Sequence, residues 1–397
     1  MKLTLNFLKK GAAFGAALAL LAGCDDGQNC SDDPLWSNVE NPAEYGWDAG
    51  KLAELRDYLG TVNTDSFMLI TKDKDNPQMP KILVDGYWND HTACRTHVIQ
   101  SISKSVSSMA YGIAEDAGVL NTKDKVAQYL EAGNGYSKHR YYDDWMSGGL
   151  LSSSSRDVTI EHIMKNISGR DWDLLVDFLI VIDGGNWNDS VLSMSQEEAP
   201  GTVWHYNNKA IQILEEVFDR AYGREGAMMD VLVNDLYGSL GITEYEIPTD
   251  GAGNVKVPAG MSLSTRDASR LAFMWMNMGS WMGKEVVSRE YMEKATRAGS
   301  DLNSGYGMLM WTNNPGNVWI GAGEPVETET SLFGNAKFIA PNGPDNMFGG
   351  YGFGSQIIVV SPDEDYAFVR FGDDMSLGKL GRELFLEVHD RIEAARR

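Results

Sequence analysis

The chain has 397 residues, 43% of them hydrophobic, and a formal net charge of −22 at pH 7. This length exceeds one ordinary hydrophobic core and favours two lobes. The strong negative charge would repel nucleic acid and anionic lipid headgroups, so we expect neither as a partner.

The N-terminal segment has the pattern of an export signal. Lysines precede an apolar run from Gly11 to Leu21, which is too short to span a membrane. The sequence Leu21-Ala-Gly-Cys24 resembles a bacterial lipobox, which implies that residues 1–23 are a lipoprotein signal peptide and that Cys24 is lipidated. The alternative is a plain secretory signal with a chance cysteine. The lipobox predicts a protein anchored in the bacterial cell envelope and facing the periplasm, and Asp25 resembles an inner-membrane retention signal.

The mature chain would begin with a polar tether over residues 24–35. Residues 1–23 carry three lysines and no acids, so their removal would move the formal charge from −22 to −25. The membrane would then be contacted through the lipid alone. Cys30 and Cys94 remain as one pair, and an oxidising compartment would allow a disulfide between them.

Both ends of the folded part combine strands and helices. The expected elements are a helix over 49–59, a hairpin of strands 66–71 and 81–88 around a turn at 73–77, strands at 356–360 and 366–371, and a helix over 378–395.

Helical patterns dominate between these ends, at 101–115, 159–167, 172–181, 208–222 and 226–238. A capping sequence at Ser264 to Asp267 predicts a further helix toward Met278. The order of elements predicts a discontinuous α/β lobe, residues 36–100 and 256–397, with a helical lobe, residues 101–255, inserted in it. Such lobes usually meet in a cleft.

The first expected helix of the inserted lobe carries Ser101 and Lys104 one turn apart. They lie on a different face from the apolar stripe, which is formed by Ile102, Val106, Met109, Ala110 and Ile113. Lys104 is either a solvated charge on an amphipathic helix or a base held beside a serine. The Ser-x-x-Lys pattern alone is weak evidence, because it recurs at Ser376 to Lys379.

The order of three motifs is more specific. Ser101-x-x-Lys104 is followed by Tyr206-x-Asn208 and then by the glycine-rich run Gly349 to Ser355. From about residue 45 onward the chain resembles the serine β-lactamase and penicillin-binding-protein superfamily, and most of all its class C-like esterases and 6-aminohexanoate-dimer hydrolases. The resemblance implies an α/β (α+β) fold in which N- and C-terminal helices flank an antiparallel sheet and an all-helical lobe is inserted.

The chemistry explains the residue types. A serine hydroxyl needs a base within hydrogen-bond reach, and a lysine serves when burial makes it partly neutral. The resemblance implies that Ser101 is the nucleophile, Lys104 its base and Tyr206 the proton shuttle. Asn208 would orient Lys104 and contact the substrate. The backbone N–H groups of Ser101 and Ser355 would form the oxyanion hole.

Each of these residues also has a structural interpretation. Tyr206 could be a core aromatic, and Asn208 could cap a helix. The third motif, Gly352-Phe353-Gly354, would border the substrate, or its glycines could mark a strand bulge. It lacks the lysine of the Lys-Thr-Gly motif in related β-lactamases, so we expect a neutral or apolar acyl group and poor β-lactamase activity.

The sequence therefore predicts a serine hydrolase that cleaves a small ester or amide through an acyl-enzyme on Ser101. The alternatives are a non-catalytic penicillin-binding-like envelope sensor and a D-amino-acid peptidase or β-lactamase. The six histidines show no metal-ligand spacing, so neither a metal nor another cofactor is expected. His205 is interpreted as a polar neighbour of Tyr206 that points away from it. Four tryptophans could line an apolar pocket, although core positions are the favoured interpretation: Trp172, Trp187, Trp204 and Trp311.

Overall fold

The computed structural model describes residues 33–148, 153–173, 177, 185–320, 324–325, 337–373 and 382–396. Residues 34–397 form one compact unit. The expected signal peptide, Cys24, Cys30 and the second Ser-x-x-Lys copy lie outside the described residues. Within the described part of the chain, none of the helices combines the length and apolar character needed to cross a membrane.

A six-stranded antiparallel sheet joins the two ends of the chain, in the order β2-β1-β13-β12-β11-β8. Its strands are β1 (Thr64–Lys72), β2 (Pro80–Tyr87), β8 (Trp311–Thr312), β11 (Phe348–Gly352), β12 (Gln356–Ser361) and β13 (Tyr366–Gly372). The expected hairpin is present as β1 and β2, the expected strands at 356–360 and 366–371 pair with each other as β12 and β13, and β1 pairs directly with β13. The predicted antiparallel α/β fold is therefore confirmed.

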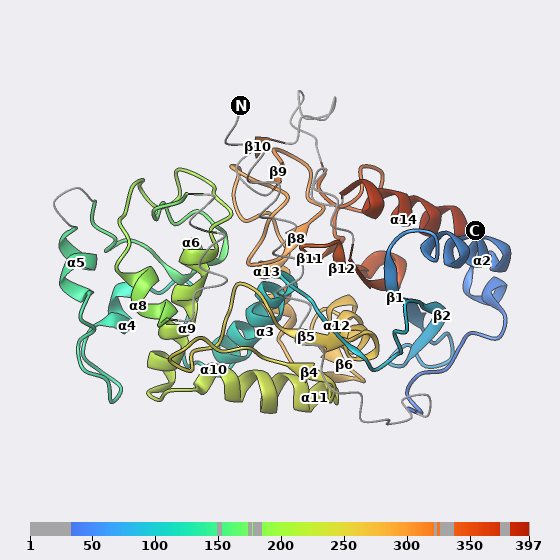
Figure 1. Cartoon of the computed structure of the whole chain (residues 1–397), viewed down its shortest axis with the longest axis horizontal. Helices are drawn as coiled ribbons and strands as arrows, with labels where there is room; N and C mark the ends of the chain where they lie inside the picture. Colours follow the sequence, from blue (N-terminus) through green and yellow to red (C-terminus); the bar gives the residue numbers. More distant parts are fainter. Residues whose placement is uncertain are drawn as a thin grey trace. The chain divides into compact units, whose positions relative to one another are not determined.

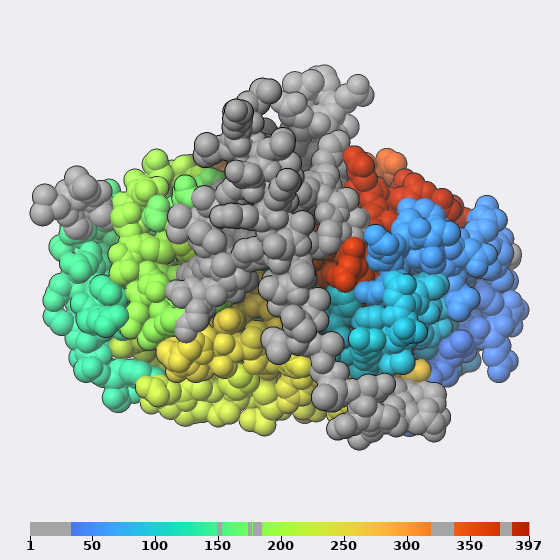
Figure 2. Space-filling view, in the orientation of Figure 1, coloured from blue at the N-terminus to red at the C-terminus, as the bar shows by residue number. Residues whose placement is uncertain are grey.

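Each face of the sheet packs into its own core because side chains alternate along a strand. In β1, Phe67 and Leu69 enter one core, whereas Met68 and Ile70 enter the other. The first core is covered by α2 (Ala49–Leu59) and α14 (Arg382–Ala395), which pack against each other beside the C-terminus (Figures 1 and 2).

The second core contains α12 (Thr265–Met276), which contacts β1, β12 and β13, and α3 (Ile102–Asp116), which contacts β11 and β12. The helices between residues 102 and 295 are α3, α4 (Val126–Leu130), α5 (Tyr142–Ser147), α6 (Ile160–Met164), α8 (Trp187–Leu192), α9 (Asn208–Tyr222), α10 (Ala227–Asp230), the π-helical η4 (Val231–Tyr237), α11 (Gly238–Leu240), α12 and α13 (Arg289–Ala295). Short 3₁₀ segments occur at η2 (Pro42–Tyr45) and η6 (Pro362–Glu364).

Small sheets complete the described part. Their strands are β3 (Thr96–Val98), β4 (Tyr245–Glu246), β5 (Ser262–Ser264), β6 (Ser280–Trp281), β7 (Lys284–Glu285), β9 (Trp319–Ile320) and β10 (Glu324–Pro325). The sheet β3-β5-β4 matters for function because β3 leads directly into the turn before α3.

The expected helices at 49–59 and 208–222 have the observed bounds of α2 and α9. The helix expected at 159–167 ends earlier, as α6, and Asn166 beyond it adopts a left-handed conformation. The pattern at 226–238 begins as α10 and continues as a π-helix. The helix expected at 172–181 lies largely outside the described residues.

Candidate active site

The turn between β3 and α3 presents Ser101. Ile99 donates its N–H to the Met261 carbonyl, and Gln100 then takes a left-handed conformation with φ of 51°. Such a conformation is uncommon for a residue other than glycine and is often retained at functional sites. The Ser103 hydroxyl holds it by donating to the Gln100 carbonyl at 2.6 Å. Ser101 consequently sits at the N-terminus of α3, where the helix dipole favours negative charge.

Lys104 lies directly beside Ser101. Its Nζ donates to Ser101 Oγ at 3.0 Å and to the Pro258 carbonyl at 2.6 Å, and the residue is only 1% exposed. Burial lowers the pKa of Lys104 to about 7, and the nearby Asp177 carboxylate opposes this effect. The interpretation of Lys104 as a solvated surface charge is wrong. The lowered pKa favours the neutral form of Lys104, which can accept a proton, more than in an exposed lysine.

The other serines of α3 have packing roles. Ser105 donates to the Leu309 carbonyl at 2.7 Å, and Ser108 donates to the Met308 carbonyl at 2.8 Å. Small hydroxyls that bond to backbone carbonyls allow the serine-bearing face of α3 to be buried together with its apolar face. The helix is therefore a buried element rather than an amphipathic surface helix.

Tyr206 completes a cluster with Ser101 and Lys104. Lys104 Nζ lies 4.8 Å from the centre of the Tyr206 ring. Burial raises the pKa of Tyr206, although an interaction of its hydroxyl with Ser101 opposes the shift. The phenol therefore stays protonated at neutral pH and suits proton relay better than direct base catalysis. The ring stacks on Trp311 with 5.8 Å between centroids, which fixes its plane.

Asn208 has a different partner from the expected one. It is the first residue of α9, and Asn207 is the capping residue, so the proposed capping role of Asn208 is wrong. Asn208 Nδ2 donates to Asp177 Oδ2 at 2.7 Å. Among the described residues, no hydrogen bond joins Asn208 to Lys104, which is oriented instead by the Pro258 carbonyl. No sequence pattern indicated Asp177 or Pro258, because tertiary folding alone brings them to Lys104.

The glycines of the third motif allow β11 to run against the nucleophile turn. A Cβ at Gly352 would lie 2.4 Å from the Ile99 carbonyl oxygen, and one at Gly350 would lie 2.9 Å from Ile102 Cγ2. Any side chain at these positions would force the strand and the turn apart. Gly352 is a regular strand residue paired with Gln356, so the bulge interpretation does not apply to it.

Ser355 follows Gly354 in the tight turn between β11 and β12, and both residues have positive φ. The Gly354 carbonyl accepts from Gln356 Nε2 at 3.3 Å and from Arg370 Nη1 at 3.4 Å. Because a peptide unit is planar, fixing this carbonyl also fixes the direction of the Ser355 N–H. Phe353 in the same turn is 37% exposed.

The remaining candidates separate into packing and partly exposed residues. Trp187 is fully buried, whereas Trp172 is partly exposed, donates to the Tyr206 carbonyl at 3.0 Å and stacks on His205. Within the described part of the chain, His205 makes no hydrogen bond to Ser101.

The disulfide prediction is tested only in part. Cys94 is disulfide-bonded, and its partner lies outside the described residues, so pairing with Cys30 stays a prediction.

Solved structures share this architecture at low sequence identity. A protein named as a 6-aminohexanoate-dimer hydrolase from Bacillus anthracis is 13% identical, with a TM-score of 0.61 over 85% of this chain and 81% of that chain. A protein named as a β-lactamase from Bacteroides dorei is 14% identical, with a TM-score of 0.62 over 88% and 99%. A family VIII carboxylesterase is 16% identical, with a TM-score of 0.56 over 87% and 96%.

The sequence comparisons add a family assignment. No curated protein sequence matches the chain. The profile of the Beta-lactamase family matches residues 80–388, which include Ser101, Lys104, Tyr206 and the third motif. The match spans most of the chain, and the fold agrees with it. The chain therefore belongs to the Beta-lactamase family.

Proposed function

We propose that the protein is a serine hydrolase that cleaves a small ester or amide through an acyl-enzyme on Ser101. The observation that carries this proposal is the 3.0 Å hydrogen bond between Ser101 Oγ and Lys104 Nζ, made by a lysine that is almost completely buried. A nucleophile paired with a desolvated base is the arrangement that activates a hydroxyl near neutral pH. The hydrolases among the structural relatives are consistent with this reaction class.

In the acylation step, Ser101 Oγ bonds to the substrate carbonyl carbon while its proton moves to neutral Lys104 Nζ. Charge that develops on the carbonyl oxygen is stabilised by the N–H groups of Ser101 and Ser355. The bond from the carbonyl carbon to the leaving oxygen or nitrogen then breaks. Tyr206 gives its phenolic proton to the leaving group and regains one from Lys104.

In the deacylation step, water attacks the acyl carbon and its proton passes through Tyr206 to Lys104. The ester bond to Ser101 Oγ breaks, and the oxygen recovers its proton from Lys104. The carboxylic acid leaves, and both side chains return to their starting protonation states. The Pro258 carbonyl holds Lys104 Nζ in place throughout the cycle.

The third motif favours uncharged substrates. Gly352-Phe353-Gly354 offers no cation to a substrate carboxylate, and the exposed Phe353 ring offers apolar surface. A charge-assisted bond to a carboxylate contributes roughly 1.5–3 kcal/mol, so its absence should cost about ten- to a hundredfold on anionic substrates.

A fluorophosphonate probe tests the nucleophile. We expect the wild type to be labelled and Ser101→Ala to lose both labelling and ester hydrolysis. Ser107→Ala is the matched control, because Ser107 lies in the same helix, is fully buried and has a hydroxyl that finds no hydrogen-bond partner among the described residues. An unlabelled wild type would favour a non-catalytic sensor, and equal losses in both variants would refute the assignment of Ser101.

Substrate preference gives a second test. The catalytic efficiency on p-nitrophenyl butyrate should exceed that on nitrocefin in the same preparation, by about ten- to a hundredfold after correction for intrinsic reactivity. Higher efficiency on nitrocefin would show that a cation outside the third motif binds the carboxylate.

A further inference from the structure

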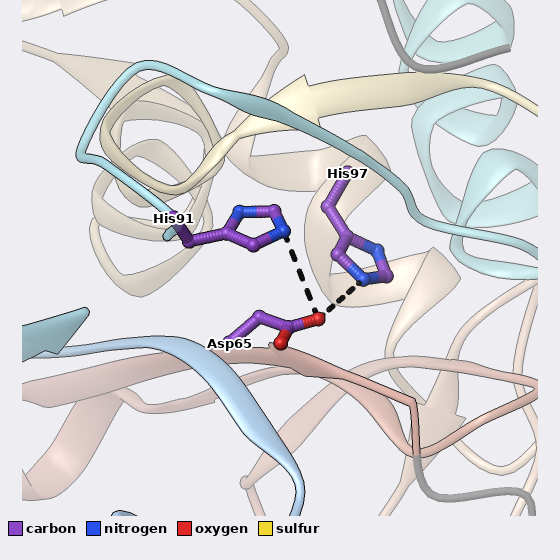
Figure 3. Close-up of side chains that lie close together, drawn as sticks. All are labelled: Asp65, His91 and His97. Carbon is purple, nitrogen blue, oxygen red and sulfur yellow. Dashed lines mark ion pairs between the residues drawn. The ribbon is translucent and has the colours of Figure 1, made fainter. Parts of the chain in front are cut away.

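Three potential metal ligands converge away from Ser101. Asp65 Oδ2 lies 3.3 Å from His97 Nε2 and 3.7 Å from His91 Nε2 (Figure 3). These ligand atoms all lie within 4.8 Å of one another. The three side chains are only 11–12% exposed, so the cluster is shielded but not sealed from solvent.

The backbone is shaped to aim each of these side chains. Asp65 lies at an irregularity in the pairing of β1 with β13, where the register shifts between Thr64 and Ser66. A bulge of this kind redirects the side chain of the extra residue. Two successive left-handed residues, Asn89 and Asp90, precede His91. Such conformations cost free energy and suggest that the position of His91 is specified rather than incidental.

The hydrogen bonds of His97 determine which nitrogen carries a lone pair. Its Nδ1 lies 3.1 Å from the Val98 carbonyl oxygen, which can only accept a hydrogen bond. In the neutral ring Nδ1 therefore carries the proton, and Nε2 directs its lone pair at the Asp65 carboxylate. Two acceptors at 3.3 Å repel each other unless a proton or a metal cation lies between them.

We propose that Asp65, His91 and His97 bind a zinc ion, with water as the fourth ligand. Zinc bonds to histidine nitrogen and carboxylate oxygen at about 2.0–2.2 Å, so ligand atoms in a tetrahedral site lie about 3.3–3.5 Å apart. The observed 3.3 Å distance agrees with this spacing, and the 3.7 Å distance exceeds it slightly. All three ligand atoms lie within 4.8 Å of one another, so small side-chain shifts would complete the site. Two imidazoles and one carboxylate are also a donor set suited to zinc.

The surrounding groups support metal binding. Asn89 Nδ2 donates to Asp65 Oδ1 at 2.9 Å and leaves Oδ2 directed at the histidines. The Val98 carbonyl oxygen accepts from His97 Nδ1, which leaves Nε2 of the neutral ring free to bind the metal. Partners of this kind orient metal ligands and increase metal affinity. Sequence spacing gave no indication of this site, because its ligands come from three separate segments.

The proposed ion would stabilise the backbone segment that leads from β3 to Ser101. His97 is the central residue of β3, and Ser101 follows four residues later through the strained Gln100. Zinc would tie β3 to the start of β1, where Thr64 accepts a hydrogen bond from Arg370 Nε. The same arginine donates to the Ser355 carbonyl at 2.8 Å. The metal would thus stabilise both the nucleophile turn and the third-motif turn without contacting the substrate.

Metal titration of the full-length chain tests the proposal independently of hydrolysis. After treatment with a chelator, calorimetry with Zn²⁺ should show one ion bound per chain. Co²⁺ should give the intense visible absorption of tetrahedral coordination. His97→Ala and Asp65→Asn should each abolish this stoichiometric binding. Asn89→Gly, which retains the left-handed backbone, should weaken zinc binding about ten- to a hundredfold.

His139→Ala is the matched control. His139 also faces carboxylates, with Nε2 3.7 Å from Asp189 and 3.9 Å from Glu216, but Arg140 and Arg220 already supply cations there. This variant should bind zinc like the wild type.

A wild type that binds no zinc would identify the cluster as an imidazolium–carboxylate ion pair and overturn the proposal. Equal binding by wild type and His97→Ala would also overturn it. If His97→Ala does not fold, the cobalt spectrum of the wild type decides, because weak octahedral bands would exclude the site.

Discussion

Two buried lysines near the candidate site have contrasting surroundings. Lys104 on α3 bonds to a hydroxyl and a carbonyl, both neutral. Lys209 on α9 is 3% exposed and donates to Asp171 Oδ2 at 3.1 Å. Within the described part of the chain, Lys104 forms no ion pair.

The difference shows how one fold can use the same residue type in two ways. A buried ammonium without a carboxylate at bonding distance loses hydration that neutral partners do not fully replace, so its charged form is disfavoured. An ammonium that is paired with a carboxylate keeps a favourable interaction in the charged form. The surroundings of Lys104 suit a base, and those of Lys209 suit a structural ion pair.

The largest expected effect is on catalysis. Lys104→Met should lower the rate of ester hydrolysis and of fluorophosphonate labelling by about 10²–10⁴-fold, the contribution of a positioned base. Lys209→Met removes a lysine of similar burial and should change these rates by less than about tenfold. It should instead cost about 1–3 kcal/mol of stability, measured by urea unfolding, because Asp171 loses a charged partner. Equal rate losses would remove the distinction between the two lysines.

The second effect is on the pH dependence of stability. The pKa of Lys104 is lowered to about 7 in the folded protein, whereas an unfolded chain has an ordinary lysine pKa of about 10.4. Between these pH values the unfolded state binds the additional proton, so the contribution of this group to the free energy of unfolding rises with pH. Below about pH 7 both states are protonated, and the cost of burying the charge is fully present.

Lys104→Met has no such charge to bury. The difference in the free energy of unfolding, Lys104→Met minus wild type, should therefore be largest at or below about pH 7. This difference should decrease toward pH 10. The same series on Lys209→Met provides the comparison. A constant difference between Lys104→Met and the wild type across this range would contradict the lowered pKa.

Sequence periodicity was sufficient to predict the contacts between residues that are close in the sequence. Ser101 and Lys104 are adjacent because a helix brings residues i and i+3 together, and the alternating faces of β1 follow from the period of a strand. The glycines of β11 were visible as a pattern, although their close packing against the turn was not.

Contacts made by tertiary folding could not be read from the sequence. The Pro258 carbonyl reaches Lys104 across 154 positions, and Asp177 reaches Asn208 across 31. The strand β3 is only three residues long and carries too little pattern to be recognised. Its pairing with β5 nevertheless determines where Ser101 begins its helix.

The smallest expected effect concerns Asp177, which influences both lysines. Its carboxylate accepts from the backbone N–H of Lys209 at 3.0 Å and from Asn208. Its charge raises the pKa of Lys104, although the opposite effect of burial is larger.

Asp177→Asn preserves the shape of the side chain and removes the charge, so the pKa of Lys104 should fall further. The acidic limb of the pH–rate profile should then move to lower pH, because the neutral base persists at higher proton concentrations. The profile of kcat/KM for p-nitrophenyl butyrate between pH 5 and 9 measures this shift, since it reports groups of the free enzyme. A loss of rate without displacement of the limb would mean that Asp177 acts through Asn208 and the start of α9 and that its charge does not tune Lys104.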